Sequence, residues 1–231
     1  MNKILFVAFF LYSAAGFSQI KGLTEDGKEV VLFENKTWKF VKESDAAALE
    51  TISSNSAKFE KSKDATFLIK SKKVNAGIYF NPKEWKVSTQ TSYPLVEYMF
   101  TRIGDQPQTM AFILNEKVQI PTYKNLKDIA IGNIQRTADY FRLKESEYRN
   151  VNGLKVLCLR YVANTKGLDF EYMVYYYLES DGYSAFTVFS PQKDFEKNLA
   201  KTEELLNGLV AVQLGTEEIR YLSPPPPMQP K

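Results

Sequence analysis

Two pairs of acidic residues are spaced so that they could do acid–base chemistry in this 231-residue chain. Asp169 and Glu171 alternate along one expected strand, so their side chains share a face, and Glu145 and Glu147 repeat this spacing. A carboxylate-based hydrolase or a Ca²⁺ site could use such a pair. Neither pair lies in a loop with calcium-ligand spacing. We therefore interpret both as exposed charges on a sheet face and expect neither a metal nor a cofactor.

Histidine is missing from the sequence, and cysteine occurs once, as Cys158. A Ser-His-Asp triad and a histidine-containing zinc site are therefore excluded, as is an internal disulfide. Cys158 lies between leucines with no histidine to activate it, so we expect a buried structural thiol and not a nucleophile. The phosphate-loop and dinucleotide-loop patterns are also missing. These observations favour a protein that is not an enzyme and has no catalytic residue.

Tyrosines form the densest aromatic group and are the candidate binding surface. The residues concerned are Tyr172, Tyr175, Tyr176, Tyr177 and Tyr183. Tyrosine is enriched at interfaces because its ring is apolar and its hydroxyl is polar. The same residues also suit ordinary packing of a sheet beneath a helix, which is the interpretation we favour.

The first 18 residues have the layout of a secretory signal peptide. Lys3 supplies a positive charge, Ile4 to Leu11 is an uncharged apolar core, and small residues precede a cleavage point after Ser18. The core is shorter than the ~20 residues of a membrane span, which favours a cleaved signal over an anchor. The phenylalanine-rich core resembles signal peptides of Bacteroidota. We expect export to the periplasm or the extracellular medium, and no stable membrane insertion after cleavage.

Turn signals and hydrophobic spacing indicate a small β motif followed by a linker. Residues 19–41 have a three-strand pattern, with Asp26-Gly27 as the hairpin signal between the first two strands. The run from Thr24 to Leu32, followed by Asn35-Lys36-Thr37-Trp38, resembles a short β motif of secreted Bacteroidota proteins, and this resemblance implies no activity. Residues 42–64 are small and polar without a sustained apolar period, so we predict a linker there.

The remaining chain alternates between strand and helix patterns. Apolar spacing predicts a helix over residues 125–141, capped by Asn125, with Leu126, Ile129, Ala130, Ile134, Ala138 and Phe141 on its buried face. The polar run Arg142–Arg149 is expected at a sheet edge. A meander over residues 154–190 follows, and Leu168–Leu178 has the pattern of a central strand. Ser190 and Pro191 are expected to open a last helix, before a proline-rich tail.

The stretch Gly77–Trp85 combines a strand end, a turn and a tryptophan that we expect to plug the core. Domains of the Mog1/PsbP/DcrB-like superfamily often open with a strand running into a phenylalanine, a proline and a tryptophan. Phe80, Pro82 and Trp85 occupy those places, so Ala65–Leu214 resembles this superfamily. The resemblance implies an α+β fold, an antiparallel sheet flanked by helices in an α/β/α sandwich. Members are mostly binding or assembly factors without catalysis.

These patterns divide the chain into five segments. They are a signal peptide (1–18), a small β motif (19–41), a linker (42–64), a Mog1/PsbP-like domain (65–214) and a proline-rich tail (215–231). We expect an exported, non-catalytic binding or assembly factor of the cell envelope whose partner is another envelope protein. The formal net charge of +3 argues against a nucleic-acid binder. The alternatives are a carrier of a small apolar or aromatic ligand and a carboxylate-based hydrolase.

Overall fold

A computed structural model describes residues 20–25, 29–32, 36, 38–40, 49–89, 93–104 and 109–213 of the chain. The expected signal peptide and the expected proline-rich tail lie outside these residues. None of the helices in the described part is both long enough and apolar enough to cross a membrane.

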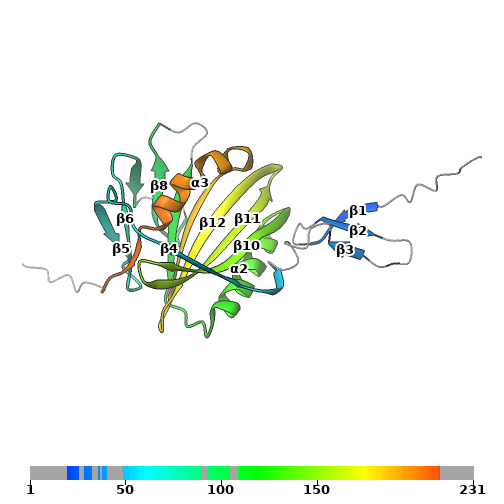
Figure 1. Ribbon diagram of the computed structural model, residues 1–231, viewed down its shortest axis with the longest axis horizontal. Helices are drawn as coiled ribbons and strands as arrows, with labels where there is room; N and C mark the ends of the chain where they lie inside the picture. Colours follow the sequence, from blue (N-terminus) through cyan, green and yellow to red (C-terminus); the bar gives the residue numbers. More distant parts are fainter. Residues whose placement is uncertain are drawn as a thin grey trace, which may run out of the picture.

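Three short strands near the N-terminus form a separate antiparallel sheet. They are β1 (Ile20–Leu23), β2 (Glu29–Leu32) and β3 (Trp38–Phe40). Val30 lies opposite Gly22 and Phe40, and it is buried, whereas Trp38 is 51% exposed. Figure 1 shows this sheet beside the main body of the protein and not within it.

The main body is built on an eight-stranded sheet. Its strands, in spatial order, are β4 (Ser53–Phe59), β10 (Tyr140–Val151), β11 (Leu154–Thr165), β12 (Leu168–Leu178), β13 (Tyr183–Pro191), β9 (Met110–Glu116), β8 (Val96–Arg102) and β7 (Trp85–Ser88). Neighbouring strands run antiparallel, except that β4 is parallel to β10.

One helix covers each face of this sheet. Helix α2 (Tyr123–Thr137) packs over β10 and β11, and α3 (Gln192–Leu206) packs on the opposite face over β12 and β13. A small sheet of β5 (Phe67–Lys70), β6 (Ala76–Phe80) and β14 (Leu209–Ala211) joins the core on the α3 side. The expected α+β class, with a sheet between helices and a small N-terminal three-strand motif, is confirmed (Figure 1).

The long meander forms because its turns suit the right-handed twist of antiparallel strands. Asn152 and Gly153 both have positive φ angles, as do Lys166 and Gly167, which is the backbone of a tight two-residue hairpin. The strand β12 pairs with β11 on one side and β13 on the other, and it is buried on both faces from Met173 to Tyr176. The expectation of a central strand at Leu168–Leu178 is therefore confirmed.

The stretch Gly77–Trp85 has the expected form. Strand β6 ends at Phe80, a turn follows, and the amides of Glu84 and Trp85 both donate to the carbonyl oxygen of Asn81. Trp85 is only 4% exposed and belongs to the same core as Phe80 and Phe100. Its role is packing.

The expectation of a linker over residues 42–64 is wrong for Ser53–Phe59, which form the edge strand β4. As a result, β10 lies between β4 and β11, and the expectation that Arg142–Arg149 forms an edge is wrong as well. Backbone pairing with β10 holds β4, helped by hydrogen bonds from Ser53 Oγ to the Ser146 carbonyl oxygen and from Asn55 Nδ2 to Glu147 Oε1. A polar strand held in this way has no hydrophobic period to reveal it.

The first helix begins and ends earlier than the apolar spacing indicates. Thr122 caps it, because its hydroxyl accepts from the amide of Asn125, and extended backbone at Ala138 ends it. Phe141 consequently lies buried in β10, while Ile129 of the expected apolar stripe is 46% exposed. The strand pairing of β10 with β11 takes over residues that also fit a helical period.

The last helix also begins later than expected. Ser190 is the partner of Glu171 in the strand pair β12–β13, so it cannot act as the cap. Pro191 occupies the N-cap position, without a side-chain hydrogen bond to the helix. Leu209, beyond the end of the helix, lies in β14 and is fully buried there.

Candidate binding surface

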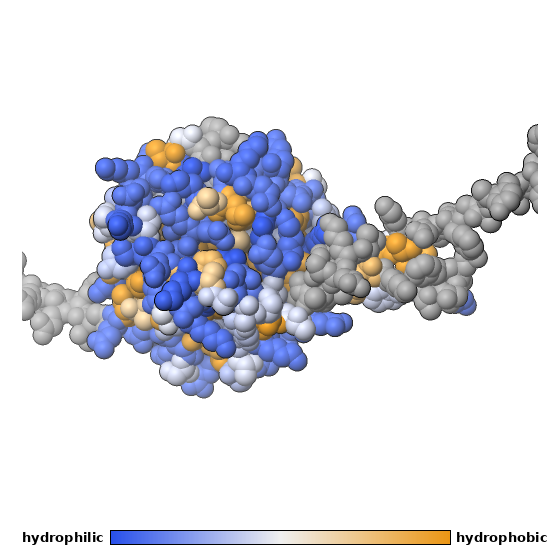
Figure 2. Space-filling view, in the orientation of Figure 1, coloured by the Kyte–Doolittle hydropathy of each residue, from blue (hydrophilic) through white to orange (hydrophobic). Residues whose placement is uncertain are grey.

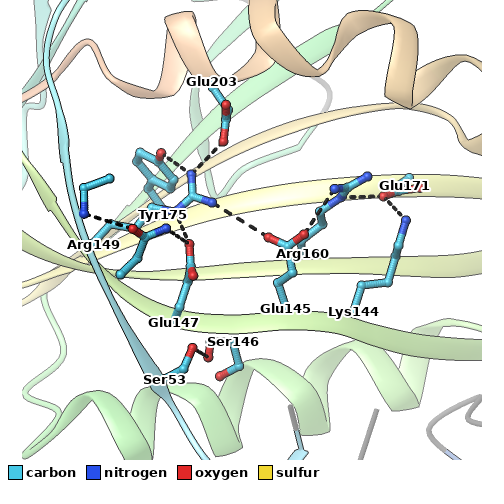
Figure 3. A network of polar contacts seen from close by, with 12 residues as sticks. Ser53, Lys144, Glu145, Ser146, Glu147, Arg149, Arg160, Glu171, Tyr175 and Glu203 are labelled. Atoms are coloured by element: carbon cyan, nitrogen blue, oxygen red, sulfur yellow. Dashed lines mark hydrogen bonds and ion pairs between the residues drawn. The ribbon is translucent and has the colours of Figure 1, made fainter. Parts of the chain in front are cut away.

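An ion-pair network lies between the sheet and α3. Its members are Lys144, Glu145, Glu147, Arg149, Arg160, Glu171, Glu196 and Glu203. Figure 3 shows that the two arginines are the centres of the network and that Glu145 lies between them. The ion-pair network therefore links three strands of the sheet, β10 to β12, to the helix α3.

Arg149 forms the first centre. Its Nη1 donates to Tyr175 Oη and to Glu203 Oε1, both at 2.9 Å, and its Nε pairs with Glu147. The guanidinium also stacks over the ring of Phe59, with 4.5 Å between the guanidinium carbon and the ring centroid. The side chain is almost fully buried, and its hydrogen bonds offset the cost of removing the charge from water.

Arg160 forms the second centre. Its Nε donates to Glu171 Oε1 at 2.6 Å, its Nη1 pairs with Glu145 at 3.1 Å, and its Nη2 donates to Glu196. Lys144 adds a second cation to Glu171, at 2.7 Å. Chiefly because of the hydrogen bond from Arg160, the pKa of Glu196 is lowered. A carboxyl with a lowered pKa is ionised at neutral pH and cannot donate a proton as a general acid.

The two acidic pairs singled out in the sequence therefore differ from the expectation of exposed charges. Glu145, Glu147 and Glu171 are half-buried or buried members of the ion-pair network. Asp169 is exposed, and it accepts hydrogen bonds from Tyr140 Oη and Asn164 Nδ2. Within the described part of the chain, no cluster of acidic or cysteine residues has the makings of a metal site.

Cys158 is fully buried in β11, on the α3 side of the sheet, as expected for a structural thiol. Burial raises the pKa of the thiol far above its ordinary value, and the nearby charge of Arg149 only partly opposes this effect. The thiolate needed for a nucleophile is therefore not available in the folded protein.

The five tyrosines of the candidate binding surface do not share a face. Tyr175 and Tyr177 point to the α3 side, where Tyr175 is fully buried and its hydroxyl donates to Asn207 Oδ1. Tyr172, Tyr176 and Tyr183 point to the α2 side, where the last two are buried. Burial raises the pKa values of Tyr175, Tyr176 and Tyr183. Most of the group is core, and Tyr172 is the member that lies beside an open surface.

That open surface, which we call the aromatic patch, lies on the α2 side of β8, β9, β12 and β13. It consists of Met99, Met110, Phe112, Phe170, Tyr172 and Phe189, all half-buried. The strand register places them on one face, because Met99 lies opposite Phe112, Met110 opposite Phe189, and Phe189 opposite Tyr172. Helix α2 packs mainly against β10 and β11. It therefore leaves this part of the sheet less covered.

Ring stacking gives the aromatic patch a defined shape. Tyr161 of β11 stacks on Tyr172, with ring centroids 4.9 Å apart, and Tyr172 stacks on Phe189 at 5.4 Å. Phe112 and Phe170 stand edge-on to Phe189, at 6.0 Å and 6.1 Å. Leu168, 61% exposed, precedes Phe170 at the beginning of β12. The result is a row of parallel rings across three strands with edge-on rings beside it.

Sequence reasoning missed most of the aromatic patch. The apolar run from Met110 to Leu114 has the pattern of a strand buried on both faces, yet Ala111 and Ile113 are buried while Met110 and Phe112 are partly open. The signal that could have revealed it is the number of large apolar faces compared with the number of helices able to cover them. On the face of the molecule that Figure 2 shows, the apolar groups are small and separate.

A cavity of about 170 Å³ lies beside the aromatic patch, between α2 and the sheet. Phe112, Tyr161, Tyr176, Tyr183 and Ala185 are among the sheet residues that line it. From the helix, Ile129 and Asn133 contribute to its wall. The cavity is smaller than the roughly 300–1,000 Å³ of most ligand pockets, but an engineered apolar cavity of about 150 Å³ can hold benzene.

Comparison with known proteins finds similarity of chain path only. No protein-family model and no curated protein matches the sequence. A cyanobacterial PsbP from Synechocystis sp. PCC 6803 is 10% identical to this chain, with a TM-score of 0.47. The similar region covers 65% of this chain and 94% of the PsbP chain. LpqN of Mycobacterium tuberculosis, described as involved in cell envelope biogenesis, is also 10% identical, with 57% and 80% coverage and a TM-score of 0.42. A Pseudomonas aeruginosa protein of unknown function is 12% identical, with 59% and 92% coverage and a TM-score of 0.46.

Proposed function

We propose that this chain is an exported, non-catalytic binding or assembly factor of the cell envelope, and that it binds another protein through the aromatic patch. The observation that carries the proposal is the patch itself. Its six large side chains lie on one sheet face and remain partly open to solvent. Contiguous apolar surface on a folded domain marks interaction sites, and aromatic residues and methionine are enriched at protein interfaces.

The shape of the patch favours a protein over a small molecule. Its residues come from four neighbouring strands of one sheet, so the surface is broad. Met99 and Met110 at one side add flexible apolar side chains, which adapt to the shape of a partner. The stacked rings of Tyr172 and Phe189 add rigid contact area that loses little entropy on binding.

The chemistry of the other polar groups supports a role without catalysis. Each carboxylate of the ion-pair network has a cationic partner, and the one thiol is buried and protonated. These groups stabilise the fold and are not poised for proton transfer or nucleophilic attack. The signal-like N-terminal sequence supports export, and with it a partner in the envelope.

Capture of partners from the native envelope tests this proposal. Gentle crosslinking followed by purification of the tagged chain should recover a second protein, and the double variant F112S/F189S should lose it. The matched control is F67S, because Phe67 is 54% exposed but lies on β5, outside the patch. Recovery of the chain alone, or equal recovery with both variants, would contradict the proposal. Circular dichroism confirms that each variant is folded.

The cavity supports a second candidate function, a carrier of a small apolar or aromatic ligand. Native mass spectrometry of the protein purified from its own envelope should then reveal a bound species. Ala185, buried in the cavity wall, gives a discriminating variant: A185L fills the space and should displace the ligand while leaving the aromatic patch intact. If no bound species is seen with the wild-type chain, the carrier function is wrong.

A further inference from the structure

We propose that the cavity between α2 and the sheet binds a single neutral aromatic ring that carries a hydrogen-bonding group, the chemical class of the phenols. This inference rests on the carrier function given above as the second candidate, and it adds the class of ligand. The volume of the cavity is about 170 Å³. Since an engineered apolar cavity of about 150 Å³ holds benzene, the space suits one ring with a small substituent.

The walls of the cavity favour an apolar and uncharged body for the ligand. Helix α2 contributes Leu126 and Ala130, and the sheet contributes Phe112 and Ala185. None of the described residues that line the cavity carries a charge. Moving a carboxylate or an ammonium group from water into such a place, without a partner of opposite charge, costs much free energy. The ligand is therefore neutral.

Two buried hydroxyls in the wall call for a hydrogen-bonding group on the ligand. Tyr161 and Tyr176 line the cavity and are 7% and 8% exposed, and neither hydroxyl has a hydrogen-bond partner among the described residues. A buried tyrosine hydroxyl usually has a partner. Tyr183 in the same wall follows this rule, because its hydroxyl donates to Glu116 Oε2 at 3.0 Å. The partners of the other two hydroxyls must come from outside the chain.

The protonation state of these hydroxyls suits a phenol. Burial raises the pKa of Tyr161 and of Tyr176, so both are neutral at physiological pH. Each can then donate one hydrogen bond and accept others. Thr187, 3% exposed, adds a third hydroxyl to the wall. A phenol also donates and accepts, so it can complete these hydrogen bonds without bringing a charge into the cavity.

The cavity has an open side through which a ring can enter. Ile129 is 46% exposed, and Asn133 is exposed one turn further along α2, yet both also line the cavity. Phe112 belongs both to the cavity wall and to the aromatic patch. The cavity is therefore continuous with the open part of the sheet face, and a ligand can reach it without crossing the core.

Fluorine NMR with three simple probes tests the class of ligand. The purified full chain is titrated at neutral pH with fluorobenzene, 4-fluorophenol and 4-fluorobenzoate. We expect 4-fluorophenol to bind about fivefold more tightly than fluorobenzene, the effect of one ordinary hydrogen bond. The charged 4-fluorobenzoate should bind at least about tenfold more weakly than 4-fluorophenol. Equal affinities for the first two probes, stronger binding of the benzoate, or no binding of any probe would overturn the proposal.

Filling the cavity tests where the probe binds. A185L adds bulk from the sheet and A130L adds it from α2, and both positions are buried. Each variant should abolish the binding of 4-fluorophenol, and having two variants guards against the misfolding of one, which circular dichroism detects. Unchanged binding in folded A185L and A130L would place the probe elsewhere and overturn the proposal.

Removing the hydroxyls tests how the probe is recognised. The double variant Y161F/Y176F should bind fluorobenzene and 4-fluorophenol about equally. It should keep the urea midpoint of the wild-type chain, because these hydroxyls make no hydrogen bond to the described chain. The control Y177F removes a hydroxyl on the α3 side of the sheet and should keep the preference for 4-fluorophenol. A preference retained in Y161F/Y176F would contradict recognition by these hydroxyls.

The probes need neither the envelope nor a natural ligand, so the two proposals can fail separately. If native mass spectrometry finds a bound species but the probes do not follow the expected order, only the class of ligand is wrong. If the probes follow the order but the chain purified from its envelope holds no bound species, only the carrier function is wrong.

Discussion

Arg149 is a residue on which the fold depends although the hydrophobic pattern of the sequence does not indicate that it is buried. Its guanidinium is buried among Glu147, Glu203, Tyr175 and Phe59, which come from four different elements. Removing one partner of a buried ion pair leaves the others with an uncompensated charge and costs about 3–5 kcal/mol. The charged residues under α3 are therefore coupled, and they should respond to substitution as a group.

The variant R149M tests this coupling. We expect the free energy of unfolding, measured by urea denaturation, to fall by about 3 kcal/mol, because Glu147 and Glu203 lose their partner and the ring contact to Phe59 weakens. The control variant K193M removes an exposed cation from the first turn of α3 and should change stability by less than about 0.5 kcal/mol. Similar values for the two variants would show that the network contributes little.

The ionisation of Glu196 should make the free energy of unfolding depend on pH in the acidic range. Its pKa is lowered in the folded state, first by the hydrogen bond from Arg160, so folding favours the ionised form. This contribution is present above the unfolded pKa of glutamate, about 4.3, and is lost as the pH falls through the lower folded value. Urea midpoints measured from neutral pH downward should therefore drop below about pH 5, and less steeply in E196Q than in the wild-type chain. An unchanged slope in E196Q, relative to the exposed control E60Q, would contradict this account.

At the scale of elements, the entry into the main sheet depends on one lysine of α2. Lys127 is 2% exposed, and its Nζ donates to the carbonyl oxygens of Leu49 at 3.0 Å and Thr51 at 2.9 Å. Burial lowers its pKa, yet the carbonyl partners stabilise the charged form. The bonds fix the chain directly before β4, a strand whose own side chains are mostly exposed.

The variant K127M should loosen β4 more than the rest of the sheet. The two carbonyl oxygens lose their donor, and a hydrogen bond from a charged group contributes about 1.5–3 kcal/mol. We expect hydrogen exchange at the amides of β4 to accelerate, with smaller changes in β11 and β12. K124M, an exposed position on the same helix, is the control. Uniform acceleration across the sheet would indicate global destabilisation instead.

Local chemistry explains which elements could be predicted from the sequence. Asn152-Gly153 and Lys166-Gly167 carry their turn signals with them, and the alternation along β12 follows from the pleat alone. The strand β4 could not be found, because its partner β10 is about 90 residues away and its contacts are polar. The aromatic patch could not be predicted either, because its prediction requires knowing which strands are neighbours and how much of the sheet α2 covers.

The whole molecule combines two cores, one on each face of the sheet, and tyrosines belong to both. Tyr175 contributes to the α3 side, and Tyr161, Tyr176 and Tyr183 to the α2 side. Burial raises the pKa of each of these hydroxyls. Both cores should therefore resist alkali until they unfold together.

Titration of tyrosine by ultraviolet absorbance tests this expectation. The folded state favours the neutral hydroxyl, so stability is retained below the unfolded tyrosine pKa of about 10 and is lost as the pH rises above it. Exposed tyrosines should ionise first, and the buried ones only with cooperative unfolding. In concentrated urea, all 14 tyrosines should titrate in one step. A single step in the native protein would show that the tyrosines are not protected.

The parallel edge strand β4 also imposes an order of assembly on the chain. Ser54 pairs with Tyr148, so the first strand of the main sheet waits for a partner that is made 94 residues later. Contacts so distant in sequence are slow to form, because the closure of a long loop precedes any gain from pairing. A chain that becomes available for folding with its N-terminus first therefore cannot complete this sheet until residues beyond Tyr148 are also available. Connectivity alone therefore delays completion of the sheet, a property that is compatible with the export we propose.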